Sequence, residues 1–139
     1  MGAPAAPGPA GGPWGLLAAD GAGVIASQLL SAAMALIAAW LIARLTLRLL
    51  TDTPAWLAQA GAGLSAAITL ATPWTVVTGS LPYTEPATLA LGAAAALAAI
   101  ETDLAPWRRA VLTGALVGVA CGAKMTSLLL VTPVAAAAV

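Results

Sequence analysis

An apolar run over residues 23–42 constrains this chain more than any other feature. Gln28 is its only strongly polar side chain, and Arg44 and Arg48 follow it at i, i+4 spacing. A helix of about 20 apolar residues crosses the ~30 Å hydrocarbon core of a bilayer. The run therefore predicts a membrane-spanning helix that ends at a basic turn.

The composition extends this interpretation to the whole chain. Hydrophobic residues make up 61% of the sequence and charged residues only 7%, against about 25% charged residues in a typical soluble domain. The formal net charge of +0 excludes the basic footprint of a nucleic-acid-binding protein. Ala and Leu dominate and favour helices over a barrel. We predict an all-α, polytopic integral membrane helical bundle of about four to five transmembrane helices.

Proline and glycine divide the chain. Residues 1–12 are rich in Gly, Ala and Pro and predict a flexible arm, because Pro interrupts regular helices. The transmembrane segment then covers 13–139, with spans expected at about 23–42, 55–77, 86–100, 110–122 and 125–139. Pro73 interrupts the second span, and we divide the last apolar stretch near Lys124 because one helix of about 30 residues would reach ~45 Å.

The basic residues predict the orientation. Arg44 and Arg48 follow the first span, and Arg108 and Arg109 follow the third. Each pair follows an odd number of crossings, so all four arginines lie on one face, which the positive-inside rule assigns to the cytoplasm. We expect an integral protein of the bacterial inner membrane. Because the sequence ends within an apolar run, we also expect an incomplete bundle whose partners are the lipid bilayer and missing helices of the same chain.

Glu85 is the first candidate for chemistry. It opens the third span, beside Tyr83 and before Pro86, on the outer face of the predicted topology. A carboxylate there could act as a base, hold a sugar hydroxyl or bind a divalent cation. The alternative is an acid that only stabilises a helix start, by ~0.3–1 kcal/mol.

Lys124 is the second candidate. A lysine within an apolar membrane segment costs about 2.5–3.5 kcal/mol on insertion scales and marks a functional position. Its ammonium group suits a phosphate oxyanion, although a lysine at a helix break can also extend to the membrane surface. Gly114, Gly118 and Gly122 line the preceding helix at i, i+4, i+8 and predict the close approach of another helix.

Two stretches resemble a known family. Residues 72–99, TPWTVVTGSLPYTEPATLALGAAAALAA, and residues 108–134, RRAVLTGALVGVACGAKMTSLLLVTPV, are similar to the outer loop, basic loop and lysine-bearing helix of bacterial C-type membrane glycosyltransferases. This superfamily includes relatives of the protein O-mannosyltransferases and of the lipid A aminoarabinose transferases. The acidic-Pro pair Glu85-Pro86 and Lys124 are the main points of similarity, with residues 13–50 compatible with the preceding surface helix and span.

The resemblance implies a function. It implies transfer of a sugar from a polyprenyl-phosphate donor to an acceptor on the outer face, with Glu85 at the rim of the active site and Lys124 and Tyr83 contacting substrate. The family more often has Asp where this chain has Glu85, and its principal acid lies in a first outer loop that has no counterpart here. We therefore expect this segment alone to transfer no sugar.

Two other classes of function fit the residues. A transporter or channel subunit would line its path with Gln28 and Lys124, but should show internal repeats with broken helices. A non-catalytic structural membrane protein would need its small-residue faces alone, and substitution of Glu85 or Lys124 would then alter only stability.

Overall fold

The computed structural model describes residues 13–79 and 84–124, together with residue 136. These residues form helices and connecting turns and contain no strand, as the all-α prediction requires. The helices are α1 (Pro13–Leu49), α2 (Ala55–Ala71), α3 (Pro73–Gly79), α4 (Glu85–Ile100) and α5 (Pro106–Ala123). The arm predicted at 1–12 and the span predicted at 125–139 lie outside this description, apart from residue 136.

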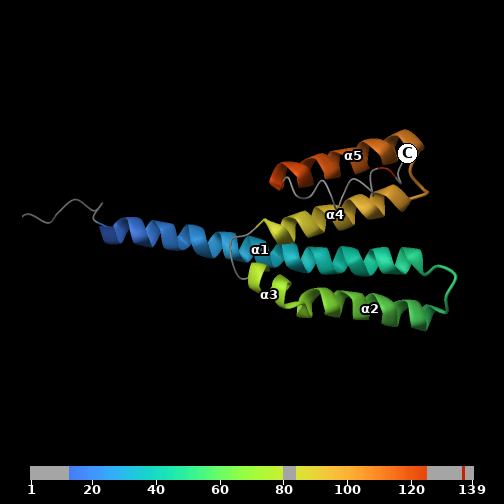
Figure 1. Cartoon of the computed structure of the whole chain (residues 1–139), viewed down its shortest axis with the longest axis horizontal. Coiled ribbons are helices and arrows are strands. Elements are labelled where there is room, and N and C mark those ends of the chain that lie inside the picture. Colours follow the sequence, from blue (N-terminus) through green and yellow to red (C-terminus); the bar gives the residue numbers. More distant parts are fainter. Residues whose placement is uncertain (1–12, 80–83, 125–135, 137–139) are drawn as a thin grey trace, which may run out of the picture.

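Helix α1 is longer than the span predicted from the sequence. It begins at Pro13, where the missing N–H and restricted φ of proline are tolerated in a first helical turn. It continues through Arg44 and Arg48 to Leu49, so the basic turn is part of the helix. At 1.5 Å per residue, its 37 residues reach about 55 Å. Its N-terminal part extends beyond the other helices (Figure 1).

The predicted second span is bent into two helices. Thr72 has φ −61° and ψ 123°, an extended conformation of the kind that a following proline favours. Pro73 then begins α3, and the axes of α2 and α3 differ by 61°. The proline that the sequence marks as an interruption therefore redirects the chain.

Helices α4 and α5 form an antiparallel hairpin beside α1, while α2 packs on another side of α1 (Figure 1). Pro86 and Pro106 lie in the first turns of α4 and α5, where proline removes no helical hydrogen bond. Ala95 and Ala120 are fully buried and lie in the same cluster, with Leu91, Leu116 and Val117 around them. Small side chains at such contacts allow helix backbones to approach closely.

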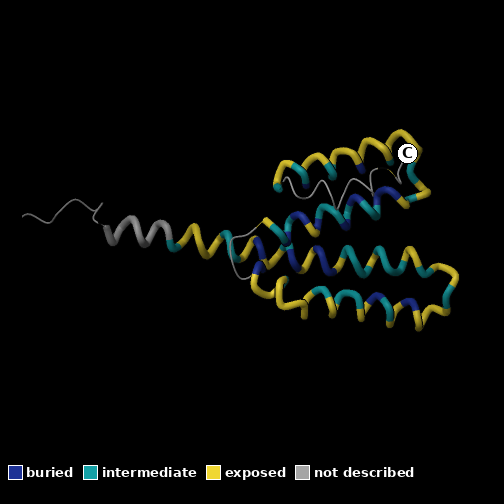
Figure 2. Tube along the Cα trace, in the orientation of Figure 1, coloured by how far each residue is buried: buried dark blue, intermediate teal, exposed yellow. Residues whose placement is uncertain are grey.

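The distribution of side-chain size is the reverse of that in a soluble protein. In the described part of the chain, every buried hydrophobic residue is an alanine. Large apolar side chains, such as those of Leu29, Trp40 and Leu64, are about 60% exposed. Figure 2 shows this burial confined to the contacts between helices. Large apolar groups normally fill the core of a soluble domain, whereas here they form the outer surface.

One helix of the described residues is long and apolar enough to cross a membrane. The segment Gly21–Leu49 of α1 is long and apolar enough to cross a bilayer, and only 22% of its most apolar window is buried. Helices α2 and α3 meet the same test only as a bent pair, and α4 is a shorter apolar helix. A helix at the centre of a soluble protein would be mostly buried, which α1 is not.

Candidate functional site

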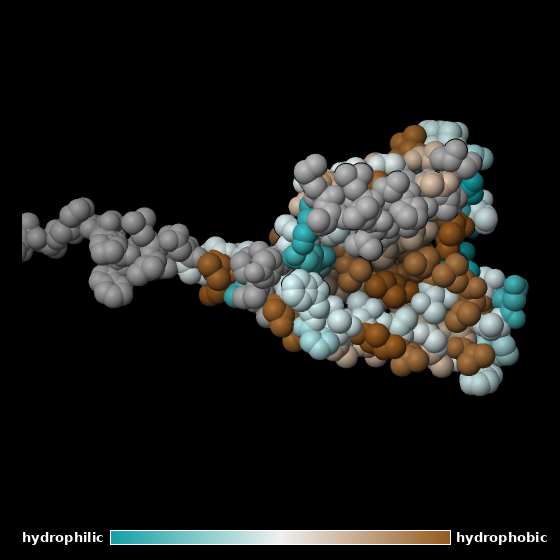
Figure 3. Space-filling view, in the orientation of Figure 1, coloured by the Kyte–Doolittle hydropathy of each residue, from teal (hydrophilic) through white to brown (hydrophobic). Residues whose placement is uncertain are grey.

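The hairpin defines two ends of the bundle. The arginine end consists of the C-terminal ends of α1 and α4 and the start of α5, which carry Arg44, Arg48, Glu101, Arg108 and Arg109. The lysine end consists of the start of α4 and the end of α5, which carry Glu85 and Lys124. The four arginines belong to the end of α1 and the start of α5 and therefore lie at the same end of the bundle (Figure 1). Figure 3 shows hydrophilic residues gathered at the two ends, with apolar residues between them.

Glu85 is the first residue of α4. Its position at a helix N-terminus places the carboxylate near the positive end of the helix dipole. Pro86 follows in the first turn, and the backbone N–H of Thr88 donates to the carbonyl of Thr84 at 2.9 Å. Local sequence alone therefore places this acid at the end of the bundle.

Lys124 is the residue at which α5 ends. Its backbone N–H still donates to the carbonyl of Ala120 at 3.1 Å, but its φ of −158° and ψ of 121° are extended. The helix break that the sequence predicts near Lys124 is thus present. The ammonium group lies at a helix end and outside the apolar middle of the bundle.

The structure joins the two candidate residues. Nζ of Lys124 donates a hydrogen bond to Oε1 of Glu85 across the lysine end, between positions 39 residues apart in the sequence. The side chains retain 39% and 21% of their exposure, respectively, so the pair is accessible from outside the bundle. The antiparallel geometry of α4 and α5 explains the encounter, because it brings the start of one helix to the end of the other.

One carboxylate oxygen of Glu85 accepts no hydrogen bond from the described residues. Oε2 is buried and has no hydrogen-bond partner among the described residues. A buried carboxylate oxygen without a partner costs about 1–3 kcal/mol or more. A hydroxyl group or a cation bound at the lysine end would supply the missing contact. The lysine end thus places an ammonium donor beside a buried carboxylate oxygen that has no partner among the described residues.

The remaining predictions for the site concern Tyr83 and a bound cation. Tyr83 lies outside the described residues. The described chain contains no group of three or more His, Cys, Asp or Glu residues able to hold a metal ion. A divalent cation, one of the ligands that the sequence leaves open, would therefore depend on Glu85, whose Oε1 already accepts from Lys124.

The sequence by itself suggests no more for Glu101 than a solvated charge in the loop after residue 100. The structure corrects this: Arg48 Nη2 donates to Glu101 Oε2 at 3.0 Å, and the acid side chain is only 24% exposed. The predicted topology contained a clue to this ion pair, since Arg48 and Glu101 follow spans that end on the same face.

The described residues do not make the helix contact predicted for the glycine face of α5. Apart from chain neighbours and the backbone of α5 itself, no atom of the described residues lies within 4 Å of a Cβ built on Gly114, Gly118 or Gly122. The close approach between helices occurs instead through Ala95 of α4 and Ala120 of α5. The glycine face is therefore open within this part of the chain.

Comparison with protein-family models, curated proteins and solved structures found no match to this chain. The features that bear on function are the ion pair between Glu85 and Lys124 and the exposed large apolar side chains.

Proposed function

We propose that this chain is a polytopic integral membrane protein segment. The exposed large apolar side chains carry the proposal, because lipid is the solvent that such a surface tolerates. Helix α1 is long enough to cross a bilayer, and its apolar window is mostly unburied. Charged groups at the two ends fit the two membrane surfaces. The positive-inside rule orients the arginine end toward the cytoplasm, as in a bacterial inner membrane protein.

We further propose that the lysine end is part of a glycosyltransferase site that uses a polyprenyl-phosphate-linked sugar. The ion pair between Glu85 and Lys124 supports this, because it places a phosphate-binding cation beside a carboxylate with a free oxygen. Nζ of Lys124 would donate to the lipid phosphate, which is the leaving group. Oε2 of Glu85 would accept from a sugar hydroxyl or bind a cation, with Tyr83 as a further substrate contact.

The chemistry of transfer divides between this segment and the rest of an active site. The bond between the anomeric carbon and the phosphate oxygen breaks, and the acceptor oxygen forms the new bond to that carbon. A base must remove the acceptor proton, and the principal acid of the glycosyltransferase superfamily has no counterpart here. Lipid-phosphate binding is therefore the property to measure on this chain, which we expect to transfer no sugar by itself.

The main alternative is that the ion pair between Glu85 and Lys124 only stabilises the bundle. Partly exposed pairs of this kind contribute only about 0.2–1 kcal/mol, and removing either partner would weaken such a connection equally. A phosphate site behaves differently, because the two residues then act in opposite directions. Lys124 attracts the phosphate, whereas Glu85 occupies the lysine and repels the same anion.

The test is binding of undecaprenyl phosphate to the purified chain in lipid nanodiscs. We expect Lys124→Gln to weaken binding at least tenfold, and Glu85→Gln to leave it unchanged or tighter. Arg108→Gln serves as the control, since it removes a cation at the opposite end and leaves the ion pair between Glu85 and Lys124 intact. Equal binding by all four proteins, with stability alone reduced, would support the structural alternative.

A further inference from the structure

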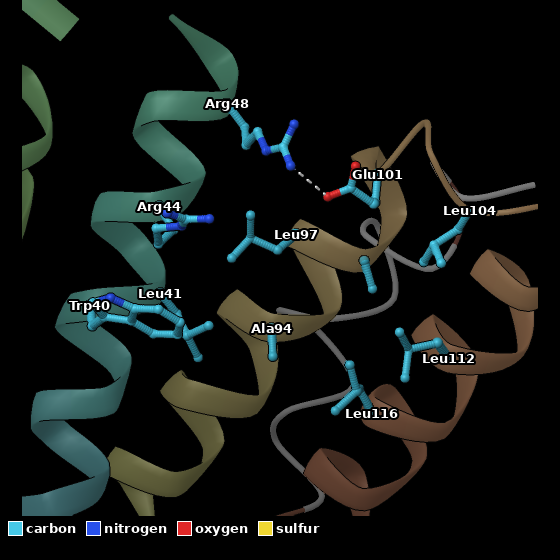
Figure 4. A pocket seen from close by; sticks show the side chains of 11 residues that line it. Trp40, Leu41, Arg44, Arg48, Ala94, Leu97, Glu101, Leu104, Leu112 and Leu116 are labelled. Atoms are coloured by element: carbon cyan, nitrogen blue, oxygen red, sulfur yellow. Dashed lines mark hydrogen bonds and ion pairs between the residues drawn. The ribbon is translucent and has the colours of Figure 1, made fainter. Parts of the chain in front are cut away.

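A second site lies at the arginine end. A cavity of about 340 Å³ opens between α1, α4 and α5, and its lining residues are shown in Figure 4. Leucines of all three helices form much of the wall, among them Leu41, Leu97 and Leu112. Arg44, Arg48 and Glu101 complete the lining on the side nearer the helix ends. The cavity is thus apolar along its walls and charged along one margin.

The two arginines that line the cavity differ in their partners. Arg48 donates to Glu101 at 3.0 Å and is compensated by that carboxylate. Arg44 forms no salt bridge within the described chain, and its guanidinium carbon lies 5.9 Å from the centroid of the Trp40 ring. The margin of the cavity therefore carries two cations against one anion. An anion bound there would gain from both guanidinium groups.

The shape and the charge together select one class of ligand. Ligand pockets typically measure about 300–1,000 Å³ and have mostly apolar walls with a few polar groups. A small soluble anion would gain nothing from the leucine walls, and a neutral lipid would leave the excess arginine charge uncompensated. Basic pockets between membrane helices on the cytoplasmic side suit anionic headgroups. An anionic phospholipid satisfies both parts of the cavity.

We propose that this cavity binds an anionic phospholipid of the cytoplasmic leaflet, with its phosphate against Arg44 and Arg48 and an acyl chain along the leucines. The inference rests on the proposed membrane placement and is independent of sugar transfer. The lipid would fill a gap at the junction of α1, α4 and α5. It would thereby stabilise the end of the bundle at which the hairpin meets α1.

The experiment uses the full chain with Trp40 as its only tryptophan, the other four being replaced by Phe. Trp40 lines the cavity, so brominated acyl chains bound there quench its fluorescence. Vesicles contain phosphatidylcholine and either brominated phosphatidylglycerol or brominated phosphatidylcholine in the same proportion. We expect brominated phosphatidylglycerol to bind several-fold more strongly, and Arg44→Gln to reduce this preference about fivefold, the effect of one basic residue near an anionic surface.

Arg108→Gln is the matched control. Arg108 lies at the same end of the bundle but outside the cavity lining. Its substitution should leave the lipid preference intact. Equal quenching by the two brominated lipids, or equal losses in the two arginine variants, would overturn the lipid site alone. Absence of quenching by either lipid would overturn the membrane placement and the lipid site with it.

Discussion

Each end of α4 carries one ion pair, but the two ends differ in what surrounds that pair. At the arginine end, Glu101 accepts from Arg48 beside a cavity, and further arginines lie in α1 and α5. At the lysine end, Glu85 meets Lys124, the only lysine of the chain. The first pair joins α1 to α4, whereas the second joins α4 to α5.

The two ends therefore suit different roles, orientation of the chain in a membrane and binding of a ligand. Several arginines at one end provide the charge asymmetry that the positive-inside rule uses. One cation beside one acid has little effect on orientation, but it can bind a single phosphate and a single hydroxyl. In the proposals above, membrane orientation and lipid contact accordingly belong to the arginine end, and substrate contact belongs to the lysine end.

The largest expected effect concerns the side of the membrane on which each end lies. Thr84 is exposed at the lysine end and Ala105 is exposed at the arginine end. In a Cys121→Ser background, we expect a membrane-impermeant maleimide to label Thr84→Cys in spheroplasts almost completely. Ala105→Cys should react only after the membrane is opened. Labelling of both cysteines from the same side would contradict the assignment of the two ends to opposite surfaces.

The second prediction breaks the lysine end while sparing the arginine end. Ala120 is fully buried in the cluster that contains Ala95 of α4, so Ala120→Leu should force the helices apart at a cost of about 1–3 kcal/mol. Carbodiimide coupling of Lys124 to Glu85, read by mass spectrometry, should fall several-fold. Ala115→Leu, at an exposed position of the same helix, should couple normally. Undiminished coupling in Ala120→Leu would show that this contact does not hold the two residues together.

A third prediction reverses a charge at the arginine end. Arg48→Glu places two carboxylates together, and we expect a loss of about 0.5–1 kcal/mol in stability, the size of a partly exposed pair. Adding Glu101→Arg should recover most of this loss, as measured by thermal unfolding in detergent. Coupling of Lys124 to Glu85 should remain unchanged in both variants. No recovery in the double variant would mean that the ion pair contributes nothing to the joining of α1 and α4.

The smallest expected effect is on the side of α5 that belongs to neither ion pair. A Cβ on Gly118 would meet no atom of the described residues, so Gly118→Leu should raise stability by under about 1 kcal/mol through helix propensity. Gly61→Leu is the comparison, because a Cβ there would lie 3.2 Å from Leu50 Cδ1. A clear loss in Gly118→Leu would show that another helix packs on the glycine face after all.

Much of the fold could be predicted from local signals. Pro73, Pro86 and Pro106 each lie in the first turn of a helix, where proline is tolerated. The end of α5 at Lys124 followed from the length of the apolar stretch. The span at 86–100 agrees closely with α4, because its limits are set by Pro86 and the charges after Ile100. The 61° bend at Thr72 was predicted only as an interruption, since its angle depends on packing against α1 and α4.

The sequence was enough to select Glu85 and Lys124 as candidate residues, but not to predict that they contact each other. Glu85 and Lys124 were notable because charges are rare and costly in apolar segments. Their contact depends on how two helices run relative to each other, and no local pattern specifies that. Glu101 was misinterpreted for the same reason, as its partner lies 53 residues away on α1.

By itself the sequence determined that this protein is helical and apolar, where α2 and α4 begin, where α4 and α5 end, and which few charges separate its apolar segments. Those properties follow from backbone chemistry and from the solvation of individual side chains, which neighbours in the sequence already set. The tertiary structure alone decided that alanines form the helix contacts, that the glycine face of α5 stays open in the described chain, and that each acid at an end of α4 meets one particular cation. These outcomes depend on packing between distant segments, because small side chains permit close approach only where a second helix is brought to them.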